Sequence, residues 1–205
     1  ETGPLLLAEC VPGGTTTAQA VLTGLGVPVD GLISGSARQP PQELKRRVVE
    51  QGLQRAQLPK CSSPQAVLAA VGDPFQAVVA AVVALALAAL PDLQRQALAD
   101  RVLLGATAWL AQETIPGDGQ SALGCLLDEI GQRFGVSLAG RASGVRFHTS
   151  RQPALRDYEN GFVKEGVGAG GLLLLAQLQG HPTDALVEDC DRAMVELLAS
   201  AVASE

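Results

Sequence analysis

The stretch Gly161–Gly171 reads GFVKEGVGAGG and leads directly into the apolar run Leu172–Leu175. Its second half holds a cluster of glycines, namely Gly166, Gly168, Gly170 and Gly171. Such glycines permit a tight turn and let other atoms approach main-chain N–H groups closely. A helix that starts here adds unpaired N–H donors and the positive end of its dipole. Glu165 lies just before those donors, so we expect it to be a carboxylate at a binding surface that can act as a general base.

Two other interpretations of this stretch stay open. The glycines can serve only to bring a helix close to its neighbour, with Glu165 as a helix cap. The spacing of Gly166, Gly168 and Gly171 also satisfies the dinucleotide fingerprint of nicotinamide-dependent oxidoreductases. That fingerprint fits poorly, because only two residues of strand character precede it and the sequence that follows, through Pro182, is helix-like with no second strand.

The longer segment Ser150–Gly171 has the pattern SRxPxLRxYExGFVKEGVGAGG. This pattern resembles the carboxyl-terminal signature of the nicotinate-nucleotide:dimethylbenzimidazole phosphoribosyltransferase family, and most of all its cyanobacterial and archaeal branch. In that family the glutamate of the EG(x)GAG motif deprotonates the incoming benzimidazole, so the resemblance assigns the catalytic base to Glu165. It also implies that Gly166 and Gly168 contact the substrate.

Basic residues precede this loop and are candidates for binding a nicotinate carboxylate or a phosphate. They are Arg151 and Arg156, accompanied by Ser150. An ion pair between Arg156 and Glu159 or Asp157 is the competing interpretation.

A second motif lies near the start of the chain. Leu5–Ala8 is apolar, glycines follow it, and Thr15–Leu25 is compatible with a helix, which predicts a strand, a turn and a helix. The turn and the first helical N–H groups suit a phosphate, although a plain helix cap explains it equally well. The segment resembles the family's ES(I/V)PGGTTT element, which lies beside the phosphoribosyl group. That resemblance assigns Glu9 to catalysis and four residues to substrate binding: Gly13, Gly14, Thr15 and Thr16.

Two more segments match the family. Val71–Gln76 reads VGDPFQ, against the family's VGDPMQ, which implicates Asp73 and Gln76, although Asp73 is also a good helix N-cap by itself. Val102–Gly105 is predicted to be a buried strand that enters a turn resembling the family's GTT(R)W. This implicates Thr107 in substrate binding, and lets Trp109 either stack on the base or join the core.

Two departures from the family pattern are visible. The strand and the GG(T/S)Q turn that should follow Gln76 are missing, and the run Ala77–Leu90 takes their place. In the loop Ser34–Pro41 the sequence Gln39-Pro40-Pro41 replaces an asparagine and a histidine, although Lys45 matches the family's lysine. The helix predicted after this loop, 42–58, has an apolar stripe of Leu44, Val48, Val49 and Leu53.

Composition restricts the class of protein. The chain has 205 residues, 47% hydrophobic and 18% charged, with a net charge of −6 and no basic face that suits nucleic acid or an anionic membrane. The four cysteines form no C-x-x-C pair, so we expect no metal site and reduced thiols. Ala77–Leu90 is shorter than the roughly 20 residues that span a bilayer and predicts a buried helix. No secretion signal opens the chain, so we expect it in the cytoplasm.

Alternating strands and helices predict one α/β domain over residues 1–205, a three-layer Rossmann-like fold with a mainly parallel sheet. The last strand is predicted at Val145–Thr149, and further helices at Pro64–Val71, Ala122–Phe134 and Pro182–Val202. Ligands of such folds bind at the carboxyl ends of the strands. Since the family pattern is already well advanced at Leu5, we expect the chain to lack an amino-terminal part of the family architecture.

The resemblance implies a reaction without a cofactor. A benzimidazole nitrogen attacks C1′ of nicotinate mononucleotide, nicotinate leaves, and the α-ribosyl 5′-phosphate of the cobalamin lower ligand forms. Glu165 would take the proton of the base, and Glu9 would stabilise positive charge at C1′. The alternative is an impaired or inactive homologue that binds nucleotide or acts as a partner subunit. The resemblance also implies a homodimer.

Overall fold

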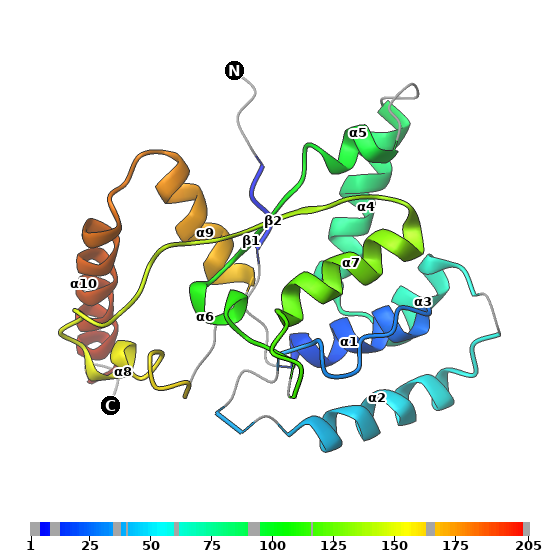
Figure 1. The fold of residues 1–205 in the computed structure, drawn as a ribbon, viewed down its shortest axis with the longest axis horizontal. Coiled ribbons are helices and arrows are strands. Elements are labelled where there is room, and N and C mark those ends of the chain that lie inside the picture. Colours follow the sequence, from blue (N-terminus) through cyan, green and yellow to red (C-terminus); the bar gives the residue numbers. More distant parts are fainter. Residues whose placement is uncertain are drawn as a thin grey trace.

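The computed structural model describes residues 5–8, 13–34, 38–39, 41–59, 62–89, 95–115, 117–162 and 167–202 (Figure 1). The helices in this part of the chain are α1 (Gly14–Gly24), α2 (Gln42–Ala56), α3 (Pro64–Val71), α4 (Pro74–Ala89), α5 (Arg95–Ala99), α6 (Ala108–Ala111), α7 (Ala122–Phe134), α8 (Pro153–Arg156), α9 (Val167–Leu178) and α10 (Thr183–Val202). The strands are β1 (Leu103–Ala106) and β2 (Ala139–Ala142). The described chain is thus a mixture of helix and strand.

The two strands form a small parallel sheet. Leu103 pairs with Ala139 at one end, and Ala106 pairs with Ala142 at the other. Parallel neighbours need a crossover connection, and here α6 and α7 supply it. Gln96 of α5 fixes the entry to β2, because its side-chain amide donates to the Ser137 carbonyl (3.1 Å) and accepts from the Ser137 N–H (2.8 Å).

Helix α9 packs on β1 with main chain against main chain. A Cβ atom on Gly170 would lie 2.1 Å from the carbonyl carbon of Ala106 and 2.3 Å from the nitrogen of Thr107. A Cβ atom on Gly105 would lie 2.6 Å from the Cα of Gly171. Real Cβ atoms do not lie this close to main-chain atoms, so Gly105 and Gly170 must both be glycine. The close-packing interpretation of the glycine-rich stretch is confirmed for Gly170.

Helix α7 covers the other face of the strands. Gly140 of β2 faces Leu127 of α7, since a Cβ on Gly140 would lie 2.9 Å from a Leu127 methyl carbon. Gly105, which faces α9, pairs with Arg141, the next residue of β2. Successive strand residues point to opposite faces, so α7 and α9 lie on opposite sides, as Figure 1 also shows. This arrangement is compatible with a three-layer α/β fold.

The amino-terminal helices form a second packed group. Helix α1 contacts both α2 and α3, and Val67 of α3 is fully buried against Gly24 of α1. The loop after α1 is fastened to α7 by an apolar cluster centred on Val27, Val29 and Ile33. This group therefore rests on the crossover helix of the sheet.

Two predicted strands are wrong. Residues 5–8 and 145–149 are irregular, and the partner of β1 is β2, which the sequence did not indicate. The segment at 145–149 is shaped by side-chain contacts instead of a ladder, because the Phe147 N–H donates to the Glu159 carboxylate (2.5 Å). The predicted strand at 102–105 is confirmed, one residue further along, as β1.

The prediction that the apolar run 77–90 is a buried helix is half right. Residues 74–89 form the regular helix α4, but none of the side chains described on it, through residue 84, is buried. Val78 is 53% exposed and Val83 is 38% exposed. An entirely apolar helix is normally enclosed by other elements. The apolar side chains described on α4 are instead exposed to solvent. None of the helices in the described part is both long and apolar enough to cross a bilayer.

The glycine contact between α9 and β1 can be tested by a matched pair of substitutions. Gly170→Ala should lower the free energy of unfolding by about 3 kcal/mol, because backbone atoms of β1 cannot yield to the added methyl group. Gly52→Ala, in α2, adds the same methyl group where the nearest atom is 4.0 Å away, and should stabilise the chain by up to about 1 kcal/mol. Denaturant unfolding measures both. Equal effects of the two substitutions would contradict the packing.

Candidate functional site

The start of α1 presents free main-chain donors. Gly13 has a φ angle of +83° and precedes the helix without a side-chain cap. Its carbonyl accepts from the N–H of Thr16 (2.8 Å) and of Thr17 (3.3 Å). Within the described residues, the N–H groups of Gly14 and Thr15 have no partner, as expected for a first helical turn. The turn predicted to hold a phosphate therefore has the donors that such a ligand needs.

Asp73 joins this turn to the start of α4. The Thr17 hydroxyl donates to one Asp73 oxygen (2.6 Å), and the other accepts from the Gln76 N–H (2.9 Å). The Gln76 side chain accepts from the Asp73 N–H in return (3.1 Å), which completes a capping box. The structure thus brings together two of the predicted site segments, which lie more than fifty residues apart in the sequence.

The end of β1 meets the start of α9. Thr107 is fully buried, and its hydroxyl accepts from the Leu110 N–H (3.3 Å) as the cap of α6. Gly168 lies in the first turn of α9, two residues before the Gly170 contact with β1. Leu6, from the amino-terminal segment, lies against Gly171, 3.3 Å from the position of an added Cβ. Residues shortly before the ES(I/V)PGGTTT-like motif therefore lie beside the glycine-rich helix.

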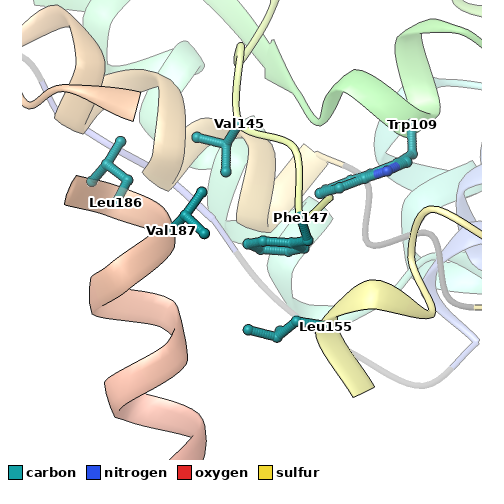
Figure 2. Close-up of a cluster of buried hydrophobic side chains, with 6 residues drawn as sticks. All are labelled: Trp109, Val145, Phe147, Leu155, Leu186 and Val187. Carbon is teal, nitrogen blue, oxygen red and sulfur yellow. The ribbon is translucent and has the colours of Figure 1, made fainter. Parts of the chain in front are cut away.

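Trp109 belongs to the core, which is the second of the two roles that the sequence left open for it. Its ring is 7% exposed and lies 5.1 Å from the ring centroids of both Phe147 and Tyr158. Figure 2 shows Phe147 in the middle of this cluster, with Trp109 on one side and Leu186 and Val187 of α10 on the other. The faces of Trp109 are occupied by protein side chains.

Glu159 is a nearly buried carboxylate that organises the loop after β2. Its side chain is 9% exposed, forms an ion pair with Arg146 and accepts from the Phe147 N–H. Burial raises its pKa, but the hydrogen bonds from Arg146 and Phe147, the nearby Trp109 indole and the charge of Arg146 outweigh that effect and hold the pKa below its ordinary value. The indole N–H is buried without a well-formed hydrogen bond of its own. His148 lies 3.4 Å from the same carboxylate.

The predicted contacts of the basic residues need correction. Arg156 donates to the main-chain carbonyl of Ser150 (2.6 Å), and Glu159 pairs with Arg146 instead of Arg156. Ser150 is buried and donates to Asp191 (2.5 Å), which also accepts from the main-chain N–H of Arg151 (2.9 Å). Ser150 and Arg156 therefore shape the turn before α8, whereas the side chain of Arg151 is exposed.

Lys45 occupies a core position that the sequence did not predict. The helix predicted at 42–58 is observed at 42–56, but it buries Lys45 and Val49, while Leu44 and Val48 are about half exposed. The Lys45 ammonium donates to the Ser34 carbonyl (2.9 Å). Burial lowers the pKa of Lys45 to about 8, and the nearby negative charge of Glu113 opposes that shift. The charge of Glu113 acts on Lys45 from the segment that follows β1.

Three predicted residues lie outside the described part of the chain, namely Glu9, Glu165 and Gly166. The predicted site residues within it do not line the hollow of about 270 Å³ that is found between α7 and the segment before β2. The oxidoreductase interpretation loses support, since residues 167–202 form only α9 and α10 and no strand of a dinucleotide-binding unit.

The architecture and site define a mixed helix-and-strand protein with a glycine turn at the start of α1. Curated relatives of the chain are named UPF0284 proteins. One from Parasynechococcus marenigrum is 73% identical across 98% of this chain and 56% of its own length. One from Prochlorococcus marinus is 53% identical (95% and 54%), and one from Gloeobacter violaceus is 37% identical (93% and 54%). The chain is a homologue of the UPF0284 proteins and spans about half the length of those it matches. No protein-family model matches it.

Each alignment has more positions than the number of residues of this chain that it covers. The alignment with the Parasynechococcus protein has 221 positions, whereas 98% of 205 residues is about 201. About twenty positions of that relative therefore have no counterpart here. The Gloeobacter alignment gives the same result, with 212 positions against 93% of 205 residues, or about 191. The chain lacks an internal segment, or segments, of about twenty residues in total.

The Glu159 ion pair predicts a pH-dependent contribution to stability. Glu159→Gln should lower the free energy of unfolding at pH 7 by about 2 kcal/mol, since it removes a charged hydrogen-bond acceptor from a nearly buried site. A lowered pKa means that the carboxylate stabilises the fold above its unfolded pKa of about 4.3 and loses that effect as the pH falls through the folded value. The cost of the substitution should therefore shrink below about pH 4. Glu50→Gln, at an exposed ion pair on α2, is the control; a pH-independent loss for Glu159→Gln would contradict the assignment.

Proposed function

We propose that the chain carries the phosphoribosyl-transfer site of a nicotinate-nucleotide:dimethylbenzimidazole phosphoribosyltransferase. The observation that carries this proposal is the Thr17–Asp73 hydrogen bond, because it unites the glycine–threonine turn with the segment that matches VGDPMQ. The names of the UPF0284 relatives state no activity. The proposal therefore depends on the four matched motifs and on this contact.

The phosphate of nicotinate mononucleotide would bind at the start of α1. The N–H groups of Gly14 and Thr15, which have no partner among the described residues, and the side chains of Thr15 and Thr16 supply uncharged donors at the positive end of an eleven-residue helix. Asp73 holds Thr17 and caps α4 at the same place, so both helix starts would be fixed before the ligand arrives. Fixed donors cost little reorganisation when charge develops.

Glu165 would act as the base. The ring nitrogen of the benzimidazole forms a bond to C1′ while the bond from C1′ to the nicotinate nitrogen breaks, and its electron pair leaves with nicotinate. The proton of the benzimidazole N–H passes to the Glu165 carboxylate. Glu9 would stabilise positive charge at C1′ in the transition state. We propose this chemistry for a single three-layer α/β domain in the cytoplasm, without a metal or cofactor.

An impaired homologue is the second candidate function. The aligned relatives have about twenty positions more than this chain, and the sequence pattern places the missing strand and glycine turn after Gln76. The uncovered surface of α4 is what such a loss would leave, because the side chains of Val78 and Val83 have no partner layer. A chain of this kind would bind nucleotide with little turnover, or would need a partner subunit.

Glu165→Gln separates the two candidates. If Glu165 is the base, the substitution should lower kcat by ~10²–10⁴-fold and leave the affinity for nicotinate mononucleotide almost unchanged. Product formation with dimethylbenzimidazole, and titration calorimetry with the mononucleotide, measure the two effects. A variant with a near-wild-type rate would exclude Glu165 as the base. Binding without turnover in the wild-type chain would favour the impaired homologue.

We also propose a homodimer, because exposed apolar patches commonly mark interfaces. The patches are on α4 and on α9, where Leu172 is 57% exposed and Leu178 is 53% exposed. A two-fold dimer is the commonest way to close one self-complementary patch. The relatives' greater length gives a competing explanation, since further segments of their chains can cover the same surface.

Light scattering tests the dimer directly. The chain should be dimeric at micromolar concentration, and the double variant Val78→Asp, Val83→Asp should be a folded monomer. Leu197→Asp, at a site on α10 that is 62% exposed, is the matched control and should stay dimeric. A stable wild-type monomer across the micromolar range would refute the proposal.

A further inference from the structure

Arg38 lies on the ring of Phe162, and this contact joins two loops far apart in the sequence. The guanidinium carbon is 5.4 Å from the ring centroid, within the range of a cation–π interaction. Arg38 precedes α2 by four residues, and Phe162 precedes α9 by five. Both side chains are open to solvent, with Phe162 52% exposed. The pair is therefore an accessible surface feature between the starts of two helices.

Within the described residues, the N–H donors of Arg38 have no hydrogen-bond partner. Other arginines have partners: Arg46 pairs with Glu43 and Glu50, Arg146 with Glu159, and Arg156 with the Ser150 carbonyl. Within the described part of the chain, Arg38 has only its contact with the ring of Phe162. A guanidinium that stacks on a ring keeps its five N–H donors at its perimeter. Such an arginine is oriented by the ring and still able to bind a carboxylate through two parallel hydrogen bonds.

The chemistry of the pair selects its ligand. A guanidinium binds a carboxylate or a phosphate through two parallel hydrogen bonds. Within the function proposed above, on which this step depends, the phosphate of nicotinate mononucleotide is assigned to the start of α1. The other anionic group of that nucleotide is the nicotinate carboxylate, which is left for Arg38.

We infer that Arg38, oriented by Phe162, binds the nicotinate carboxylate and so distinguishes nicotinate mononucleotide from nicotinamide mononucleotide. The amide of the second nucleotide carries no charge and cannot accept two hydrogen bonds from one guanidinium. This assignment takes the carboxylate contact away from Arg156, whose guanidinium is already bound to the main chain. Phe162 acts as a positioning residue, since the Arg38 guanidinium lies over its ring.

Binding of the two mononucleotides, measured by calorimetry, tests the inference. The wild-type chain should bind the nicotinate form more tightly, and Arg38→Gln should weaken that binding by ~10–100-fold, as for the loss of a charged hydrogen-bonded pair, without changing affinity for the nicotinamide form. Arg38→Lys should keep part of the preference for the nicotinate form, because lysine keeps the positive charge but lacks the two parallel N–H donors of the guanidinium. Arg47→Gln, an equal loss of charge at an exposed position of α2, should change neither affinity.

The outcomes separate this inference from the proposed function. An Arg38→Gln variant that keeps the wild-type preference, or that loses both nucleotides equally, would overturn the role of Arg38 and leave the proposed function standing. A wild-type chain that binds neither nucleotide would overturn both. Thermal unfolding of Arg38→Gln should match that of the wild type, since an exposed pair contributes little to stability.

Discussion

The main-chain contact between α9 and β1 is the constraint on which the described structure depends most. Gly170 and Gly171 lie against the backbone from Gly105 to Thr107, and a Cβ atom on Gly105 or Gly170 would clash with main-chain atoms there. The contact fixes the first turns of α9 relative to the end of β1. Both of these segments carry matched motifs. Leu6 lies against Gly171, and Thr107, which caps α6, lies against Gly170.

Nearly buried charged side chains hold the loops around this contact in place through hydrogen bonds. Glu159 holds the segment after β2 through Arg146 and the Phe147 N–H, and in doing so places Phe147 between Trp109 and α10. Lys45 joins the loop before α2 to the segment after β1 through the Ser34 carbonyl and the charge of Glu113. Each charged group has a hydrogen-bond partner, and Glu159 is also ion-paired, as burial requires. The loops between the helix starts are therefore organised by a few polar contacts as well as by the apolar clusters.

Sequence patterns predicted the helices well, because caps and periodicity are local. Pro64–Val71 and Ala122–Phe134 have the observed bounds, with Ser63 and Ser121 as N-caps. The inward face of α2 could not be predicted, because Lys45 is buried through partners distant in sequence. Strand β2 reads AGRA and has no β-branched or alternating pattern, so only its pairing with β1 reveals it. At the site, the motifs located the turn at Gly13–Thr16 and the Asp73 cap, but the Arg38–Phe162 contact depends on tertiary structure and left no signal in the sequence.

The proposed transfer reaction is tested most directly by its product. Nicotinate mononucleotide and dimethylbenzimidazole would be incubated with the chain, and in parallel with a version in which the roughly twenty missing positions are restored from the Parasynechococcus relative. We expect equal amounts of nicotinate and α-ribazole 5′-phosphate by liquid chromatography and mass spectrometry, with the restored version at least as active as the chain itself. Absence of both products from both proteins, when each is folded, would contradict the assignment of a phosphoribosyltransferase site.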